Sequence, residues 1–328
     1  MRQPEVAGHL GTLLAALVLV APVVVALRAL VVATAFLLEF LSDGAHPVLT
    51  RLTAPPIAVA LDADTDRYLP GGVFTGRPLV LVHGLTPAGK DDPRVQRAAR
   101  LLARAGFDVA VPTVAGLTRA RLRPEDAGVV VKALAARPGP TRLVSVSVGA
   151  GPAFLAAAHG AVRDRVSRVL ALGAYASALE LIRFHLTGVY AWNGIDGRVA
   201  PDDATAARAV IEANAELAAP ALREALAGGD PAAVERALAT LPAATRRLLD
   251  AVSPERVIGA IAAPIVLVHG RGDPAVPFTE SLRLAAARPA GTRVVLVGAI
   301  GHVEGGAATG VTDFLRLAGV VYALVAAD

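Results

Sequence analysis

The chain of 328 residues contains no cysteine. Disulfide bridges, a thiol nucleophile and thiolate metal ligands are therefore excluded. Lysine is nearly absent too, since Lys90 and Lys132 are the only two, and aromatic residues make up only 4% of the chain. Arginines supply most of the positive charge, but they are scattered along alanine-rich segments. A nucleic-acid surface needs clustered basic residues or stacking aromatics, so we expect no nucleic-acid partner.

Charged residues are scarce, at 18%, and one long stretch has almost none. Between residues 10 and 41 only Arg28 and Glu39 are charged. About 20 apolar residues cross the hydrocarbon core of a bilayer, so we predict a single-pass membrane anchor over residues 1–41. A cleaved signal peptide, with small residues at 33–35, and a hairpin turning at Arg28 are alternatives. The stretch is longer than the apolar region of about 7–15 residues that signal peptides carry.

The charges on either side of this stretch predict its orientation. Arg2 and the amino terminus outweigh Glu5 before it, whereas Asp43 and Arg51 cancel after it. By the positive-inside rule, the remainder of the chain is expected outside the cytoplasm. Membrane lipid is then a partner of the N-terminal segment.

The rest of the chain alternates between strand-like and helix-like segments. Residues 42–75 are rich in proline and glycine and predict a connector with one strand, in IAVALDA. Within residues 76–328 the predicted strands are PLVLVH (78–83), FDVAVP (107–112), RLVSVS (142–147), SRVLALG (167–173), APIVLVHG (263–270) and TRVVLVG (292–298). Helical periodicity fills most of the gaps between them. This alternation predicts an α/β fold with a mostly parallel central sheet flanked by helices.

One block interrupts the alternation, at residues 176–261. It shows no strand pattern and contains amphipathic helical segments, such as AAVERALATLPAATRRLLDAV at 232–252. An insertion of this length between two strands predicts a helical cap at one edge of the sheet.

The first strong strand runs into a near match to a phosphate-binding loop. Gly84, Gly89 and Lys90 satisfy G-x-x-x-x-G-K, but Asp91 stands where a Ser or Thr hydroxyl would meet Mg²⁺. We therefore interpret Lys90 and Asp91 as surface charges at the start of the next helix. No histidine spacing indicates a metal site either, so we expect no metal and no cofactor.

Three residues suited to nucleophilic catalysis follow three predicted strands. Ser147 follows RLVSV, Asp273 lies just beyond IVLVHG, and His302 lies in a glycine-flanked loop after VVLVG. The carboxyl ends of parallel strands meet at one edge of a sheet, so these residues are expected to converge. A serine hydroxyl becomes a nucleophile when a histidine takes its proton and a carboxylate orients that histidine. Glu304, close to His302, is a competing carboxylate.

The residues around Ser147 form a variant of a known turn. S-V-S-V-G matches the G-x-S-x-G nucleophile elbow, except that Ser145 replaces the first glycine. The elbow needs small residues where the following helix passes close to the strand, and Gly149 and Gly151 meet that need.

Over residues 76–328 the chain resembles the α/β-hydrolases, especially their dienelactone-hydrolase-like and esterase-like members. The resemblance rests on HGL at 83–85, SVSVG at 145–149, HGRGDPAVP at 269–277 and GH at 301–302. It implies that Ser147 is the nucleophile, Asp273 the acid and His302 the base. It also implies an oxyanion hole formed by the N–H groups of Leu85 and Val148.

The expected activity is hydrolysis of a carboxylic ester through an acyl-enzyme, on a small acyl substrate that is hydrophobic or lipid-like. Gly84 permits close backbone approach, and His83 and Trp192 are candidate substrate-binding residues, with buried structural roles as their alternative. The same triad also serves serine peptidases, thioesterases and acyltransferases, since fold and triad do not fix the substrate. A non-catalytic membrane-bound binding protein of the same fold is a further alternative. Oligomeric state is not predicted.

Overall fold

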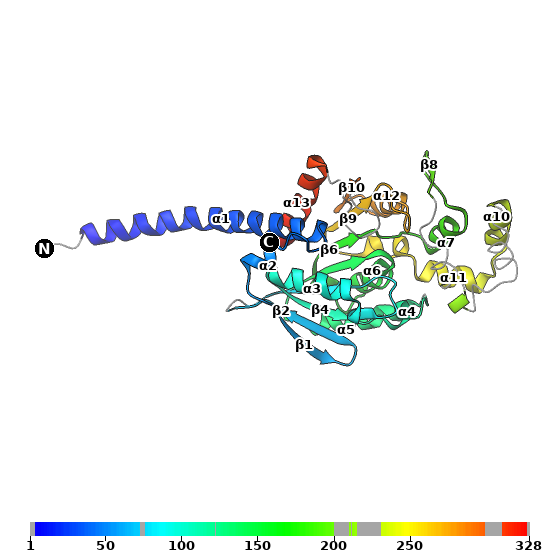
Figure 1. Cartoon of the computed structure of the whole chain (residues 1–328), viewed down its shortest axis with the longest axis horizontal. Coiled ribbons are helices and arrows are strands. Elements are labelled where there is room, and N and C mark those ends of the chain that lie inside the picture. The colour runs from blue at the N-terminus through cyan, green and yellow to red at the C-terminus, as the bar shows by residue number, and fades with distance from the viewer. Residues whose placement is uncertain are drawn as a thin grey trace.

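The fold is built on an eight-stranded sheet with the strand order β1-β2-β4-β3-β5-β6-β9-β10 (Figure 1). The computed structural model describes residues 4–72, 76–121, 123–199, 210, 212–214, 231–298 and 310–326, with side chains from residue 22 onward. The strands are β1 (Ile57–Asp62), β2 (Thr65–Leu69), β3 (Arg77–Val82), β4 (Phe107–Pro112), β5 (Thr141–Val146), β6 (Val166–Leu172), β9 (Ile265–Gly270) and β10 (Thr292–Val297). The β1–β2 and β2–β4 pairs are antiparallel, and the other five pairs are parallel.

Helices connect and cover these strands. They are α1 (Pro4–Leu41), α2 (Val48–Leu52), α3 (Pro93–Arg104), α4 (Ala115–Thr118), α5 (Ala127–Ala135), α6 (Ala150–Ala158), α7 (Ala178–Thr187), α10 (Pro231–Ala239), α11 (Ala243–Ala251), α12 (Thr279–Ala287) and α13 (Val311–Val325). Short 3₁₀ turns are η1 (Gly89–Asp91), η2 (Pro124–Asp126), η3 (Ser147–Gly149), η4 (Arg163–Arg165), η6 (Pro254–Arg256) and η7 (Ile258–Ala260). The predicted fold class, a mostly parallel sheet flanked by helices, is confirmed.

Each face of the sheet is covered by its own set of helices. Successive side chains of a strand point to opposite faces. In β3, Val80 and Val82 pack in the core with α5 and α6, whereas Leu79 and Leu81 pack in the core with α1, α3 and α13. Burial on both faces explains why these strands read as nearly continuous apolar runs, and why their positions could be predicted to within two residues.

The predicted connector contains more structure than one strand. Residues 57–69 form the β1–β2 hairpin, which joins the sheet through the pairing of β2 with β4. Tyr68 of β2 is buried, while the whole of β1 is exposed as the edge strand.

The expectation that residues 176–261 hold no strand is wrong. Val189–Trp192 (β7) and Ile195–Arg198 (β8) form an antiparallel hairpin. Asn193 and Gly194 occupy its turn, with φ of 49° and 81°. Two successive residues with positive φ, in the sequence Asn-Gly, are typical of the type I′ hairpin turn. The helices α7, α10 and α11 supply the helical part of this block.

The apolar N-terminal segment is one continuous helix, α1, which passes through Arg28 without a break, so the hairpin alternative is wrong. Its Pro22–Leu41 part is long and apolar enough to cross a membrane, with a mean hydropathy of 2.2, and is the one such helix among the described residues. Residues 22–28 are exposed, and α1 extends well away from the body of the molecule (Figure 1). Its last turns behave differently, because Ala33 and Leu37 are buried in the core that includes α13.

Candidate active site

Ser147 lies at the carboxyl end of β5, in the turn that leads into α6. Its backbone φ is +54°, a left-handed conformation that few residues other than glycine adopt. Such backbone strain is stored mainly at functional sites. The side chain is 8% exposed and lines a cavity of about 1000 Å³. This is the conformation that the nucleophile elbow requires.

Glycines make this turn possible. A β-carbon at Gly149 would lie 2.2 Å from the carbonyl oxygen of His83, and one at Gly84 would lie 3.2 Å from the β-carbon of Ser147. The ends of β3 and β5 therefore approach each other too closely for a side chain at Gly149. Ser145 is fully buried within β5, between Val82 and Ala171 on the neighbouring strands, so its hydroxyl cannot meet a substrate.

His83 fixes the loop that follows β3. Its Nδ1 donates to the carbonyl of Gly84 over 2.7 Å, and its Nε2 accepts the N–H of Val114 over 2.9 Å. Burial lowers the pKa of His83, and the hydrogen bond to Gly84 opposes that shift. The ring lines the cavity, but both of its nitrogens bind backbone groups. Its contacts hold the backbone at Gly84, which lies next to Ser147.

Asp92 and Thr86 hold the other end of this loop. Thr86 Oγ1 donates to Asp92 Oδ2 over 2.7 Å, and Asp92 Oδ1 caps α3 by accepting the N–H of Arg94 over 2.8 Å. The hydrogen bond from Arg94, with that from Thr86, holds the pKa of Asp92 well below its usual range. The sequence analysis missed this pair. Its signal was the Asp92-Pro93 dipeptide, a helix start with proline in the first turn.

Lys90 is not the surface charge that the sequence analysis predicted. Its side chain is only 13% exposed, and its Nζ lies 3.3 Å from Asp66 of β2 and 2.9 Å from Asp91. The ion pair with Asp66 attaches η1 to the β1–β2 hairpin.

Asp273 lies just beyond β9 and is fully buried. Its Oδ1 accepts the N–H groups of Ala275 and Val276 over 2.8 and 2.9 Å. Its Oδ2 lies 3.4 Å from Nε2 of His269, which also donates to the carbonyl of Val276 over 2.8 Å. His269 is therefore a buried residue that positions the Asp273 loop, with its Nδ1 lying 2.7 Å from Oγ of Ser281.

The structure brings several predicted site residues to one cavity. Ser147, His83, Gly84, Leu85 and Val148 all line it, together with the residues that follow Asp273, at 274–276. Trp192 does not line it and lies beside the turn of the β7–β8 hairpin.

His302 and Glu304 lie outside the described residues, so the base and its competing carboxylate stay predictions. His185 of α7 lines the same cavity and was not predicted. Among the described residues, no group of three or more His, Asp or Glu side chains is arranged to hold a metal ion.

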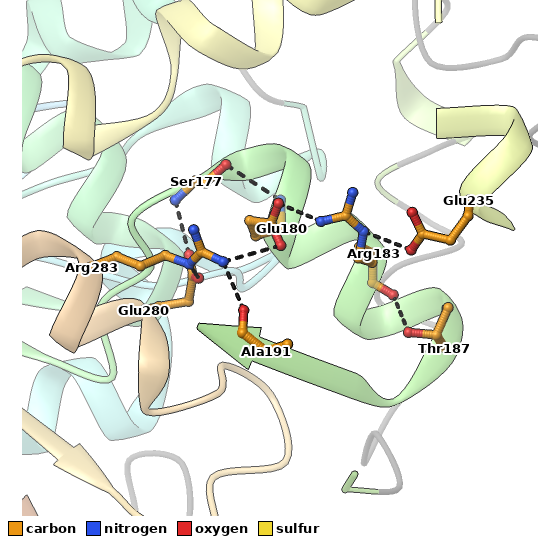
Figure 2. Close-up of polar contacts among 8 residues, drawn as sticks. All are labelled: Ser177, Glu180, Arg183, Thr187, Ala191, Glu235, Glu280 and Arg283. Carbon is orange, nitrogen blue, oxygen red and sulfur yellow. Dashed lines mark hydrogen bonds and ion pairs between the residues drawn. The ribbon is translucent and has the colours of Figure 1, made fainter. Parts of the chain in front are cut away.

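A polar network joins the inserted block to α12 (Figure 2). Arg283 of α12 contacts Glu280 over 3.1 Å, Glu180 of α7 over 3.5 Å and the carbonyl of Ala191 in β7 over 2.9 Å. Arg183 of α7 pairs with Glu180 and also with Glu235 of α10. The network thus links α7, β7 and α10 to α12.

Glu280 is the buried carboxyl group of this network, and it accepts the N–H groups of Ala176 and Ser177 over 2.9 Å each. Burial raises the pKa of Glu280 to about 7 from 4.5, against the lowering effects of these N–H groups and of Arg283. Between these values the folded state keeps a proton that the unfolded state loses, so stability falls as pH rises.

We expect Glu280→Gln to lose this pH dependence. The free energy of unfolding of the wild type, relative to that of the variant, should fall by about 1–3 kcal/mol between about pH 4.5 and pH 7. Urea titrations in detergent at several pH values measure it. The readout is the difference in the free energy of unfolding between wild type and variant at each pH. Buried His83, whose pKa is lowered, destabilises the folded state as the pH falls, and this contribution cancels in the difference. Glu235→Gln, an exposed member of the network, is the control, and equal slopes in all three proteins would contradict the prediction.

Comparison with known proteins supports the fold. No protein-family model and no curated protein sequence matches the chain. A truncated carbohydrate esterase from gut microbiota superposes with a TM-score of 0.51 at 14% identity, over 83% of this chain and 95% of that one. The chain has the α/β-hydrolase fold, as the sheet order and the likeness to this esterase show.

Two other neighbours are more distant. An acylaminoacyl peptidase in complex with a chloromethyl ketone gives a TM-score of 0.47 at 15% identity, over 75% of this chain. The chain spans only 37% of that peptidase. The 2,6-dihydroxy-pseudo-oxynicotine hydrolase gives 0.49 at 16% identity, over 88% of this chain and 72% of its own. At these identities the likeness extends to the fold alone.

Proposed function

We propose that the chain is a serine hydrolase that cleaves a carboxylic ester, with Ser147 as nucleophile, His302 as base and Asp273 as the orienting acid. The observation that carries the proposal is the left-handed backbone of Ser147 at the end of β5, facing a large cavity beside Gly84. A strained serine in this position has no structural need, since β5 could pass into α6 through a glycine.

The proposed reaction has two halves. As Ser147 Oγ bonds to the ester carbonyl carbon, its proton passes to His302, and the N–H groups of Leu85 and Val148 stabilise the oxyanion. The carbon–oxygen bond of the ester then breaks, and the alcohol leaves with the proton from His302. Water next attacks the acyl-enzyme, giving its proton to His302, and the acid leaves as Ser147 regains its hydrogen. Asp273 stabilises the charged imidazole in both halves.

An ester is the preferred substrate, and the other acyl substrates are alternatives. The carbohydrate esterase that shares the fold over 83% of the chain is an ester hydrolase by its name. A peptidase, thioesterase or acyltransferase would use the same three residues. Turnover of a p-nitroanilide or a thioester at a rate above that of the matching p-nitrophenyl ester would favour one of these instead.

Labelling with a fluorophosphonate probe tests the nucleophile directly. The probe should label the full chain in detergent at one peptide, which mass spectrometry assigns to Ser147, and the label should be absent from Ser147→Ala. Ser281→Ala, which removes a buried hydroxyl beside His269, is a control that should keep the label. A folded protein that stays unlabelled would favour the non-catalytic binding protein.

We also propose that α1 anchors the protein in a membrane, that residues 42–75 connect it to the hydrolase domain at 76–328, and that this domain lies outside the cytoplasm. The support is the exposed apolar stretch that begins at Pro22 and the charge balance around the helix. After alkaline carbonate extraction the full-length chain should stay in the membrane pellet, and protease added to intact cells or spheroplasts should digest it. A shortened, soluble chain would instead indicate a cleaved signal peptide.

A further inference from the structure

The cavity at Ser147 extends far beyond the residues needed for catalysis. Its volume is about 1000 Å³, at the upper end of the range of about 300–1,000 Å³ for small-molecule sites. From Ser147 it follows one face of the sheet, where the side chains of four adjacent strands line it: Leu81, Val144, Leu170 and Val268. The cavity therefore continues underneath the carboxyl edge of the sheet.

His185 of α7 also lines the cavity, but the sheet face that the cavity follows is the one opposite the inserted block at 176–261. Its four strand residues belong to the core that contains α1, α3 and α13. The helices of the inserted block, represented by Ile182 of α7 and Val234 of α10, pack in the other core, with α5 and α6. A substrate group that enters this cavity thus leaves Ser147 in the direction of α1 and α13.

The end of α1 forms one wall of the cavity. Phe36, Leu37 and Phe40 line it, and the rings of Phe36 and Phe40 stack with centroids 6.0 Å apart. Helix α13, which packs beside α1, supplies Leu317, Val320, Val321 and Leu324 to the same wall. The same helix α1 carries the exposed apolar stretch at residues 22–27, which extends away from the body of the molecule (Figure 1). The helix that forms this wall is therefore also the helix that we assign to the membrane.

The lining also holds charged residues, which are Glu39 of α1, Asp43 after it, Asp92 before α3, and Arg94, Arg97, Arg100 and Arg104 of α3. Arg100 lies over the ring of Tyr68, and the others engage one another or the backbone. Arg97 pairs with Asp43, and Arg104 donates to the carbonyls of Thr50 and Thr53. Glu39 accepts the N–H and the hydroxyl of Thr50. Apart from these charged residues, Leu, Val and Phe side chains form the wall between the sheet and the helices, and such a wall suits methylene groups.

We propose that this cavity binds the acyl chain of a long-chain ester, between the sheet and helices α1 and α13, so that α1 is a wall of the substrate site. The proposal rests on the proposed function, because the chain must be attached to the carbonyl that Ser147 attacks. It names the substrate class, a lipid ester, and it makes α1 a specificity element as well as an anchor.

Filling the cavity at a distance from Ser147 tests the proposal. Val320→Trp, in the full chain, adds bulk on the α13 wall, where Val320 is buried. The ratio of kcat/KM for p-nitrophenyl laurate to that for p-nitrophenyl butyrate should fall about tenfold or more, because each methylene kept out of an apolar site loses binding several-fold. Thermal unfolding in detergent checks that the variant folds. Leu315→Trp is the matched control, since Leu315 is on the same helix and 64% exposed, and its ratio should not change.

The outcomes separate this proposal from the proposed function. If the wild type cleaves butyrate and the ratio is the same in both variants, the acyl-chain site is wrong and the serine hydrolase stands. If the wild type cleaves butyrate but not laurate, the acyl-chain site is also wrong. Absence of both activities together with absence of label at Ser147 would remove the proposed function itself. Should Val320→Trp fail to fold, as thermal unfolding would show, Phe40→Trp makes a smaller change on the α1 wall with the same readout.

Discussion

Replacing Ser147 with alanine should lower kcat for p-nitrophenyl butyrate by about 10⁴-fold or more, the scale of loss when the nucleophile of a serine triad is removed. Alanine retains the β-carbon of Ser147, which lies close to Gly84, and the variant loses only the hydroxyl group. We therefore expect the melting temperature to stay close to that of the wild type. Initial rates at saturating ester, together with thermal unfolding in detergent, measure both quantities.

Ser145→Ala is the matched control for this variant. Ser145 lies two residues earlier in β5, fully buried, and within the described part of the chain its hydroxyl has no hydrogen-bond partner. Removing a buried hydroxyl without a partner should leave activity unchanged and stability equal or slightly greater. Substantial turnover by Ser147→Ala with loss of activity in Ser145→Ala would reverse the assignment of the two serines.

The sequence predicted the sheet well because its strands are buried on both faces. The runs at 107–112 and 292–298 match β4 and β10 almost residue for residue. Such strands need apolar residues at every position, which makes them visible without knowledge of the fold. The β7–β8 hairpin was missed because each of its strands has only four residues, half-buried in β7 and mostly exposed in β8, although Asn193-Gly194 is a strong turn signal.

The position of α1 could not be predicted from its residues. A lipid tail and a protein core are equally apolar, so Ala33 and Leu37 suit either environment. The sequence therefore does not mark where the part of α1 in contact with lipid ends and the part buried in protein begins. Only the partner helix α13, almost 300 residues later in the chain, decides that these turns are buried in protein. The cavity also depends on the packing of segments that are far apart in the sequence. It is space left between α1, α13 and the sheet, and no local pattern encodes it.

The positions of Ser147 and Asp273 at the ends of β5 and β9 could be predicted from the sequence, because each is a polar residue that follows an apolar run. The residues that hold the site in shape were less visible. His83, Asp92 and His269 act through hydrogen bonds to backbone groups, which depend on how loops from different strands meet.

Asp273→Asn should lower kcat for the same ester by about 10³- to 10⁴-fold while the loop keeps its structure. The carbonyl oxygen of asparagine can accept the N–H groups of Ala275 and Val276, as Oδ1 of Asp273 does at 2.8 and 2.9 Å. In the proposed triad, the variant loses the negative charge that would stabilise the imidazolium of His302 and select its tautomer. The loss should therefore appear in kcat much more than in the melting temperature.

Two variants in parallel make this result specific. Asp250→Asn removes a carboxylate that is 55% exposed and paired with Arg256 on the surface of α11, and it should keep wild-type kcat. Glu304→Gln removes the competing carboxylate near His302 and should keep most of the activity. If Glu304→Gln loses the activity and Asp273→Asn retains it, Glu304 is the acid of the triad. Asp273 would then be a structural residue that shapes the loop after β9, which its two backbone hydrogen bonds alone would explain.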